Sequence, residues 1–160
     1  MSFQVARALT GRLSVTQVLH VRDEKAQNTE GGTFTSGAWR VRDLNASKTN
    51  TITGASLASN QITLPAGTYW VDASAPAFAV DRNQLRLQNT TGAATLLTGS
   101  TEFAGSATQR AFLQGLFTLT ATSVLELQHR AAGTAATNGF GVKANLTTEV
   151  YSDVVIWKTA

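Results

Sequence analysis

The stretch NQITLPAGTYWVDASAPAF, residues 60–78, decides the fold of this chain. In its first part Ile62 and Leu64 alternate with polar residues, which is the period of a strand with one buried face. Pro65 then has no N–H to donate to a sheet, and Gly67 is free to adopt a positive φ. The pattern predicts a strand that ends in a tight corner.

After the corner the alternation restarts. One face carries Tyr69 followed by small or branched residues, and the other face begins with Trp70. Aromatic and β-branched residues suit the pleated surface of a packed sheet. We therefore predict a long strand over residues 68–75 in the middle of a sandwich, closed by Pro76. The residues of the structural corner are Leu64, Pro65, Gly67 and Tyr69.

The same period of two recurs along most of the remaining sequence. Further strands are expected at residues 13–21, within 33–45, and at 51–53, 83–89, 94–97, 100–103, 110–120, 123–130, 140–146 and 150–158. Polar loops separate them, including one over the charged residues 22–30, and we find neither an amphipathic helix nor an internal repeat. About ten short strands predict an all-β chain folded as a β-sandwich or barrel.

Composition limits the classes of function. The 160 residues suit one domain, and at that size a core forms without covalent staples. Cysteine is absent, which excludes disulfides and thiolate metal sites. The net charge of +3 comes from scattered basic residues, so we expect no nucleic-acid partner. Because no apolar run reaches the ~20 residues that span a bilayer, and no secretion signal opens the chain, we expect no membrane insertion and synthesis in a cytoplasm.

Motifs of catalysis and cofactor binding are missing from the sequence, which has no nucleophile elbow, phosphate-binding loop or zinc-binding helix motif. We therefore expect no enzyme activity, no catalytic residue, no cofactor and no metal. His129 lies on the same strand face as Leu127, and we expect a core or interface histidine rather than a ligand. A candidate ion-pair set comprises Asp72, Asp81, Arg82 and Arg86.

The stretch TFTSGAWRVRDLN, residues 33–45, is the second conspicuous one. Trp39 and Val41 share one face of the expected strand, while Arg40 and Arg42 share the other. Two arginines beside a tryptophan are compatible with a ligand site. The favoured interpretation is a strand at a surface or subunit contact whose arginines pair with nearby carboxylates.

Five segments in order carry a resemblance to a known superfamily. They are GGTFTSGAWRVRDLN, ITLPAGTYWVDASAPAF, LELQHR, TNGFGV and YSDVVIWK. The L-P-A-G-T-Y corner before a long strand, the glycine-aromatic segment at residues 139–141 and the final aromatic strand are similar to the TNF/C1q-like jelly rolls. Within that superfamily the chain most resembles small virion proteins of tailed bacteriophages, of the fibre and decoration type. The resemblance covers most of residues 13–158.

The resemblance implies a homotrimer in which each subunit is a jelly-roll β-sandwich of about ten strands. Residues 13–160 would form the jelly-roll domain, and residues 1–12 a short N-terminal arm. A trimer would also bury aromatic residues that one sandwich cannot cover, and the chain has twelve of them. Candidates for the core or the trimer interface are Trp39, Trp70, Phe117, Phe140, Tyr151 and Trp157.

Three functional interpretations remain open. The first is a fibre, spike or tail-tip module of a bacteriophage virion, made in the cytoplasm of the host bacterium, which presents loops to glycans of the host surface. The second is a capsid decoration, or cement, protein that stabilises the head through other virion proteins. The third is a soluble lectin-like or enzymatic β-sandwich module. The candidate recognition loops are residues 46–59, 97–109 and 131–138.

The arm, residues 1–12, has Phe3, Val5 and Leu9 among basic residues and shows no strand period. So little apolar area folds only against a partner. We expect the arm either to attach the protein to other virion proteins or to pack on its own trimer.

Overall fold

The computed structural model describes residues 17–159, and in this range the chain is all-β. Eleven strands and no helix occur among the described residues. The strands are β1 (Gln17–Lys25), β2 (Arg40–Val41), β3 (Ala46–Asn50), β4 (Ser56–Ala58), β5 (Gln61–Leu64), β6 (Gly67–Ala77), β7 (Asp81–Asn89), β8 (Ala94–Ala104), β9 (Gln109–Leu119), β10 (Ser123–Ala131) and β11 (Glu149–Lys158). The prediction of an all-β chain of short strands is confirmed. The arm and the first residues of the strand expected at 13–21 lie outside the described range.

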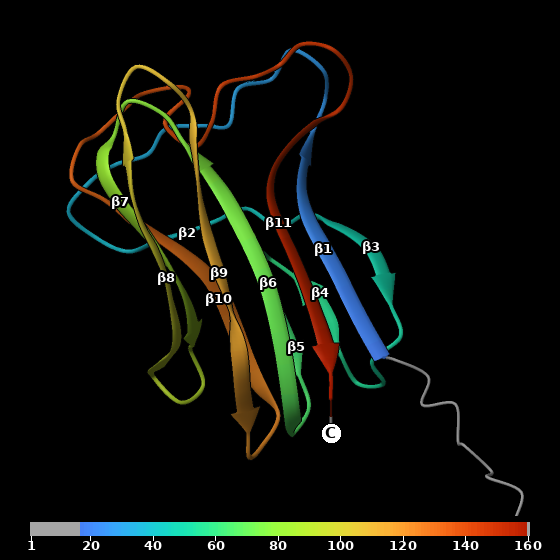
Figure 1. The fold of residues 1–160 in the computed structure, drawn as a ribbon. Coiled ribbons are helices and arrows are strands. Elements are labelled where there is room, and N and C mark those ends of the chain that lie inside the picture. The colour runs from blue at the N-terminus through green and yellow to red at the C-terminus, as the bar shows by residue number, and fades with distance from the viewer. Residues whose placement is uncertain (1–16, 160) are drawn as a thin grey trace, which may run out of the picture.

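The strands form two antiparallel sheets that pack face to face (Figure 1). The first, here called the β6 sheet, has the strand order β3-β1-β11-β6-β9. The second, the β7 sheet, has the order β4-β5-β10-β7-β8, and β2 also pairs with β10. From β5 onward the chain passes repeatedly between the two sheets, so that strands adjacent in each sheet are mostly distant in sequence. This arrangement is a jelly-roll sandwich.

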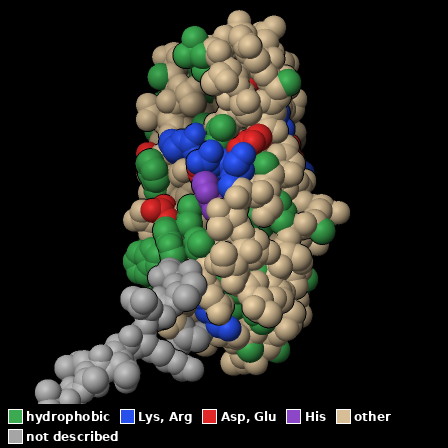
Figure 2. Space-filling model, turned by 90° about the vertical axis from the view of Figure 1, so that its right-hand side faces the viewer, with side chains coloured by type: hydrophobic (Ala, Val, Ile, Leu, Met, Phe, Trp, Pro, Cys, Tyr) green, Lys and Arg blue, Asp and Glu red, His purple; other side chains and the backbone are tan. Residues whose placement is uncertain are grey.

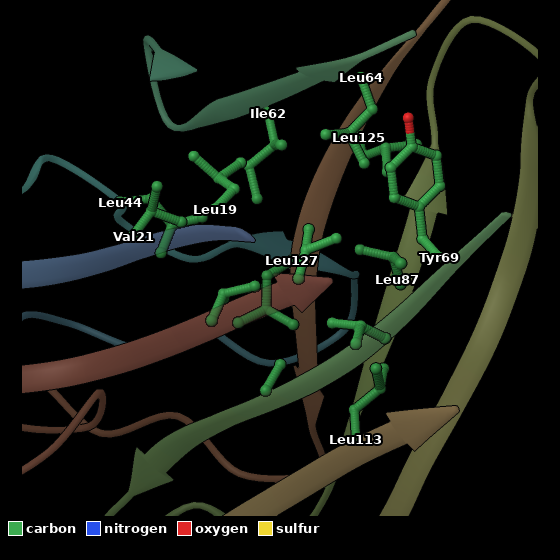
Figure 3. Packing of buried hydrophobic residues seen from close by; sticks show 14 of the residues in the cluster. Leu19, Val21, Leu44, Ile62, Leu64, Tyr69, Leu87, Leu113, Leu125 and Leu127 are labelled. Carbon is green, nitrogen blue, oxygen red and sulfur yellow. The ribbon is translucent and has the colours of Figure 1, made fainter. Parts of the chain in front are cut away.

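The core lies between the two sheets and is almost entirely aliphatic (Figure 3). The inward side chains of β6 are those that the alternation predicted, since Tyr69, Val71 and Ala73 are at most 1% exposed. Leu85 and Leu87 of β7 are buried from the other sheet, again as predicted. Each fully buried large side chain stabilises the fold by roughly 1.5–3 kcal/mol, which explains a stable domain without disulfides.

The two ends of the sandwich differ. At one end, Gln17 of β1 pairs with Lys158 of β11, close to the start of β6. At the other end, which we call the distal end, β6 finishes at Ala77. Ala77 belongs to a second, smaller cluster of buried residues with Phe34, Val80, Ala104, Ala131 and Ala135. The distal end is therefore closed by small side chains around Phe34, separately from the main core.

The predicted corner joins β5 to β6. Tyr69 is buried, and its hydroxyl donates a hydrogen bond to the carbonyl oxygen of Pro65 at 2.8 Å. Gly67 opens β6 with a φ of +157°, a positive value as expected. The ring of Tyr69 thus fixes the corner from inside the sandwich.

The prediction that Pro76 closes the second strand is wrong. β6 continues to Ala77, and Pro76 pairs with Arg110 of β9. The pairing of β11 with β6 reaches only Ser74, so β6 has an unpaired edge beyond that residue. Proline is tolerated at such an edge because its missing N–H is not needed there.

β1 extends farther than the sequence pattern predicts, and the expectation of a loop from residue 22 is wrong. The strand runs on to Lys25 because its charged side chains are paired. Lys25 Nζ lies 3.0 Å from Asp23 Oδ1 and 2.9 Å from Asp43 Oδ2. A run of charges, which resembles a loop in the sequence, is thereby stabilised within a sheet.

The strand expected at residues 140–146 is also wrong. The segment between β10 and β11 forms a loop at the distal end, with Leu146 83% exposed. The carboxylate of Glu149 accepts hydrogen bonds from the backbone N–H groups of Ala144 and Asn145, each at 2.8 Å. The Glu149 side chain therefore accepts the backbone hydrogen bonds that, in a strand, would be made to a neighbouring strand.

Several smaller expectations also need correction. The strands expected at 94–97 and 100–103 are one strand, β8, which follows β7 through two register shifts. No strand forms at residues 51–53, whereas β3 and β4 occupy parts of the expected loop 46–59. Most of the expected loop 97–109 belongs to β8, which leaves residues 105–108 as the connection to β9.

Candidate functional site

The outer face of the β6 sheet carries a row of large apolar side chains. Strand register places Val18, Trp157, Trp70 and Leu116 side by side across four strands. Trp70 is 40% exposed and Leu116 is 58% exposed. Adjacent apolar side chains that remain in contact with water mark an interaction surface.

A compact cluster of charged side chains lies on the same face. Asp153 is at its centre, where it accepts a hydrogen bond from Arg22 Nε at 3.0 Å and lies 2.8 Å from His20 Nε2. Together with Asp72 and Ser74, these residues line a hollow of about 280 Å³. On the β1 side of the molecule, Figure 2 shows a histidine with basic and acidic side chains beside it and hydrophobic side chains adjacent.

Arg110 of β9 completes this cluster from the opposite side. Its Nη1 donates to Ser74 Oγ and to the carbonyl oxygen of Tyr151, both at 2.9 Å. Burial lowers the pKa of the Arg110 guanidinium, and the charge of Asp153 opposes that shift. A face with internally paired charges beside exposed apolar side chains suits contact with another protein.

The aromatic candidates from the sequence separate into different environments. Trp70 and Trp157 lie on the outer face of the β6 sheet, where they pair across β6 and β11. Phe117 and Tyr151 are core residues, at 6% and 3% exposure. The Phe117 ring stacks on Tyr69 with a centroid distance of 5.4 Å.

Trp39 and Phe140 lie elsewhere. Trp39 has the guanidinium carbon of Arg86 4.3 Å from its ring centroid, on the β7 sheet. Phe140 packs against Phe34 at the distal end, with a centroid distance of 4.5 Å. Neither belongs to the apolar row.

Sequence reasoning missed the contribution of β9 to this face. Phe112 and Leu116 point outward, and Phe112 is 48% exposed. The signal was present, because the inward positions Leu113 and Phe117 leave two large apolar residues on the opposite face of the strand.

Arg42 is the largest surprise relative to the sequence. It is 1% exposed, so the prediction of a surface arginine paired with carboxylates is wrong. Its three side-chain nitrogens donate to Ser152 Oγ at 3.0 Å, the Pro76 carbonyl at 3.2 Å and the Phe140 carbonyl at 3.0 Å.

The Phe140 ring centroid lies 4.2 Å from the Arg42 guanidinium carbon. Burial lowers the pKa of Arg42 to about 9, a value at which the group keeps its proton at neutral pH. Arg42 therefore ties β6, β11 and the distal loop together as a structural cation rather than a ligand-binding one.

His129 is completely buried, as the core interpretation predicted. Its Nε2 lies 2.9 Å from Asn83 Oδ1, and its ring packs on Phe34 at a centroid distance of 4.9 Å. Burial, and secondly the charge of Arg42, lower the pKa of His129 well below its usual value. A neutral imidazole donates from Nε2 to Asn83 Oδ1, whereas its buried Nδ1 has no hydrogen-bond partner among the described residues.

The candidate ion-pair set does not assemble. Asp81 and Arg82 form a loose pair at 3.6 Å. Arg86 instead donates to Gln128 Oε1 at 2.8 Å, and Asp72 lies on the other sheet. Asp72 lies on β6, whereas Asp81, Arg82 and Arg86 lie on β7 in the other sheet.

A second hollow lies on the outer face of the β7 sheet. Strand register aligns Arg130, Gln84 and Thr101 across β10, β7 and β8. With Trp39 and Arg82 they line a groove of about 600 Å³, here called the Trp39 groove. Its wall comes from Ser36, Gly37 and Trp39, which precede β2, and its rim includes Ala131 and Ala132, at the start of the expected recognition loop at 131–138.

Two classes of site are not seen within residues 17–159. No group of three or more histidine and carboxylate side chains is placed to hold a metal ion in that part of the chain. The described residues also contain no helix long and apolar enough to cross a membrane.

No protein-family model matches the chain, and no curated protein matches it in sequence. Solved structures do match. Eiger TNF from S. frugiperda has a TM-score of 0.60 at 16% identity, covering 91% of this chain and 93% of that chain. The globular domain of zebrafish complement 1qA has a TM-score of 0.55 at 16% identity, covering 91% of this chain and 98% of that chain.

PRD1 vertex protein P5 is also similar, with a TM-score of 0.57 at 15% identity, covering 91% of this chain and 98% of that chain. At such low identity the likeness concerns the fold. The same two-sheet sandwich is thus shared by cytokine, complement and viral proteins. The chain has the TNF/C1q-like jelly-roll fold, as its five sequence segments predicted.

Proposed function

We propose that this chain is a structural protein of a bacteriophage virion, a homotrimeric fibre, spike or tail-tip module that presents its distal end to glycans of the host surface. Two comparisons support the proposal. A virion vertex protein, PRD1 P5, has the same fold. Proteins with TNF/C1q-like folds are typically homotrimers.

The observation that carries the proposal is the outer face of the β6 sheet. Trp70 and Leu116 leave apolar area in water, and each Å² of such area favours burial by about 25 cal/mol. In a closed trimer this face of each subunit is directed toward the three-fold axis, and one part of it contacts a different part of the neighbouring subunit. The charged cluster around Asp153 then supplies polar contacts that set the orientation of the subunits.

A trimer of this kind leaves the distal end open. Residues 105–108 and 132–138 lie there, because Gly105 accepts a backbone hydrogen bond from Ala79 and Ala135 pairs with Phe34. Gln17 and Lys158 lie at the opposite end. Attachment through residues 1–12 therefore leaves the distal loops free to meet a host surface.

Sedimentation equilibrium tests the oligomeric state. The wild-type protein is expected to be a thermally robust trimer at micromolar concentration. Trp70→Glu and Leu116→Glu place a charge in the apolar row and are expected to give monomers. Phe103→Glu is the matched control, since Phe103 is 63% exposed on the other sheet. A wild-type monomer, or a trimer that survives both row substitutions, contradicts the proposed interface.

The location on the virion tests the biological role. Antibody against the distal loops is expected to label purified particles at the tail tip or at spikes. A protein absent from particles rules out the virion role. Label spread evenly over the head supports the decoration role instead.

A capsid decoration protein is the second candidate, and one geometric feature favours it. Gln17 and Lys158 emerge at the same end, which permits one-sided attachment to a shell. Deletion of residues 1–12 tests attachment in either role, because Phe3, Val5 and Leu9 are the arm's apolar residues. Attachment predicts a normal trimer that no longer incorporates into particles. A truncated protein that incorporates at full occupancy rules attachment out, and one that fails to trimerise shows that the arm packs on its own trimer.

A further inference from the structure

We propose that the Trp39 groove binds an acidic saccharide, a sugar ring that carries a carboxylate or a phosphate group. The inference rests on the proposed host-recognition function and adds a site and a ligand class to it. The residues of its lining that carry the argument are Trp39, Arg82, Arg130, Gln84 and Thr101.

The wall of the groove is held in place before any ligand arrives. Arg40 Nε donates to the carbonyl of Thr35 at 3.0 Å, and its Nη2 donates to the carbonyl of Ser36 at 3.3 Å. On the other side of the same turn, the N–H of Ser36 donates to Thr134 Oγ1 at 3.0 Å. The segment that leads into Trp39 is therefore braced from two directions, which reduces the entropy lost on binding.

Trp39 is itself anchored by the sheet. Arg86 lies against one face of its ring at 4.3 Å and is held by Gln128 Oε1 at 2.8 Å. An aromatic ring fixed at the edge of a groove provides an apolar platform for a flat molecule. The aliphatic C–H face of a sugar ring fits such a platform.

The charge of the groove selects an anion. Arg130 is exposed, and within residues 17–159 no side-chain hydrogen bond or ion pair engages it. Among residues 17–159 the Arg82 side chain makes one contact with a carboxylate, a loose one with Asp81 at 3.6 Å. Two carboxylates of the same sheet are hydrogen-bonded by neutral side chains: Glu126 accepts from Gln61 and Gln128, and Glu102 accepts from Ser100.

Arg86 adds to the positive charge. Burial, and secondly the charge of Arg130, lower the pKa of Arg86, as expected where guanidinium groups lie close together. Guanidinium groups bind carboxylate and phosphate through paired N–H donors. A carboxylate or phosphate bound by Arg130 relieves the repulsion between Arg130 and Arg86.

Polar groups at the floor of the groove suit hydroxyl recognition. Gln84 Nε2 donates to the Gly99 carbonyl at 3.1 Å and to Thr101 Oγ1 at 3.2 Å. Its amide oxygen is thus oriented as an acceptor, and the Thr101 hydroxyl keeps its proton to donate. With about 600 Å³, the groove matches the size of typical small-ligand sites and holds a mono- or disaccharide.

The location of the groove agrees with a role in recognition. It lies on the outer face of the β7 sheet, while the proposed trimer uses the outer face of the β6 sheet. Three grooves would therefore stay open on the outside of a trimer. Weak sites that engage a surface together bind far more tightly than one site alone.

Titration calorimetry on the full-length protein at low salt tests the inference. The probes are glucuronic acid, glucose 6-phosphate, glucose and inorganic phosphate, together with an RNA oligonucleotide and a poly-glutamate peptide. We expect a Kd of order 1 mM for one or both acidic sugars and no measurable binding of glucose. The two acidic sugars distinguish a carboxylate from a phosphate ligand.

Arg130→Gln is expected to raise the Kd of the acidic sugar about tenfold, because a charge-assisted pair is lost at an exposed site. Lys48→Gln, which removes an exposed cation from β3 on the other sheet, is the matched control and leaves the Kd unchanged. The proposal is overturned if glucose binds as tightly as glucuronic acid. It is also overturned if inorganic phosphate alone binds as tightly as the acidic sugars. Preferential binding of the RNA or the peptide, or an unchanged Kd in Arg130→Gln, also overturns it.

Failure of this inference is distinguishable from failure of the proposed function. A trimer that incorporates into particles but binds neither acidic sugar retains the virion role and loses the groove. A protein that binds the sugar in an Arg130-dependent manner but is absent from particles retains the groove and loses the virion role.

Discussion

Substitution of Gly141 by alanine is a sharp test of how the distal end is packed. Gly141 has a φ of +130°, and a Cβ atom there would lie 2.6 Å from Tyr151 Cδ1 and 2.9 Å from Pro76 Cγ. Tyr151 cannot move away easily, because its hydroxyl donates to the Thr29 carbonyl at 2.5 Å. The methyl group therefore meets two fixed neighbours.

The expected magnitude follows from two separate effects. An alanine at this φ costs about 1 kcal/mol of backbone strain. Overpacking against Tyr151 and Pro76 adds roughly 1–3 kcal/mol. Together they predict a loss of about 2–4 kcal/mol in the free energy of unfolding, or roughly 6–12 °C in Tm for a chain of this size.

Gly37→Ala is the matched control. Gly37 has a φ of +88°, but a Cβ there meets nothing within 4 Å, so only the strain of about 1 kcal/mol remains. Guanidinium unfolding at one fixed protein concentration measures both variants, since concentration affects the stability of an oligomer. If Gly141→Ala is no less stable than Gly37→Ala, the close packing of Gly141 inferred from the structure is wrong.

Three further predictions concern the core and the corner. Arg42→Met leaves three acceptors without a donor but also removes a buried charge. We expect a net loss of roughly 2–4 kcal/mol in the free energy of unfolding, measured in urea. An unchanged urea midpoint would show that these hydrogen bonds make no net contribution to stability. Because the pKa of His129 is lowered in the folded state, its contribution to stability is complete above the unfolded pKa of 6.5 and is lost as the pH falls below it. Tm should therefore fall between pH 7 and pH 5, and less steeply in His129→Leu; equal slopes count against a buried neutral histidine. Gly67→Ala should cost about 1 kcal/mol at the corner, where φ is +157°, and an unchanged Tm contradicts this.

Much of the fold could be predicted from local pattern alone. Period-two alternation identified the inward residues of β6, β7 and β10, because a strand with one buried face must alternate whatever its partners are. The Pro65 and Gly67 corner was also evident, since both residues restrict the backbone locally. About ten short strands and the lack of a helix period indicated a β-sandwich or barrel.

The candidate sites depended on contacts between residues that are distant in sequence. The Trp39 groove joins residues 82–84, 101 and 130, which lie on three different strands, with residue 39, which directly precedes β2. Local pattern cannot show which strands become neighbours in a sheet, so the expected ion-pair set around Asp81 was wrong and the groove was not anticipated.

Local pattern by itself determined the strand class, the corner and the inward face of each strong strand, because those depend on backbone sterics and on alternation. Only the tertiary structure decided that Arg42 is buried and that residues 140–146 form a loop. Both outcomes follow from long-range partners: the carbonyls of Pro76 and Phe140 for the guanidinium, and the carboxylate of Glu149 for the loop. A side chain's environment is set by where the sheets place its neighbours, which period and composition do not specify.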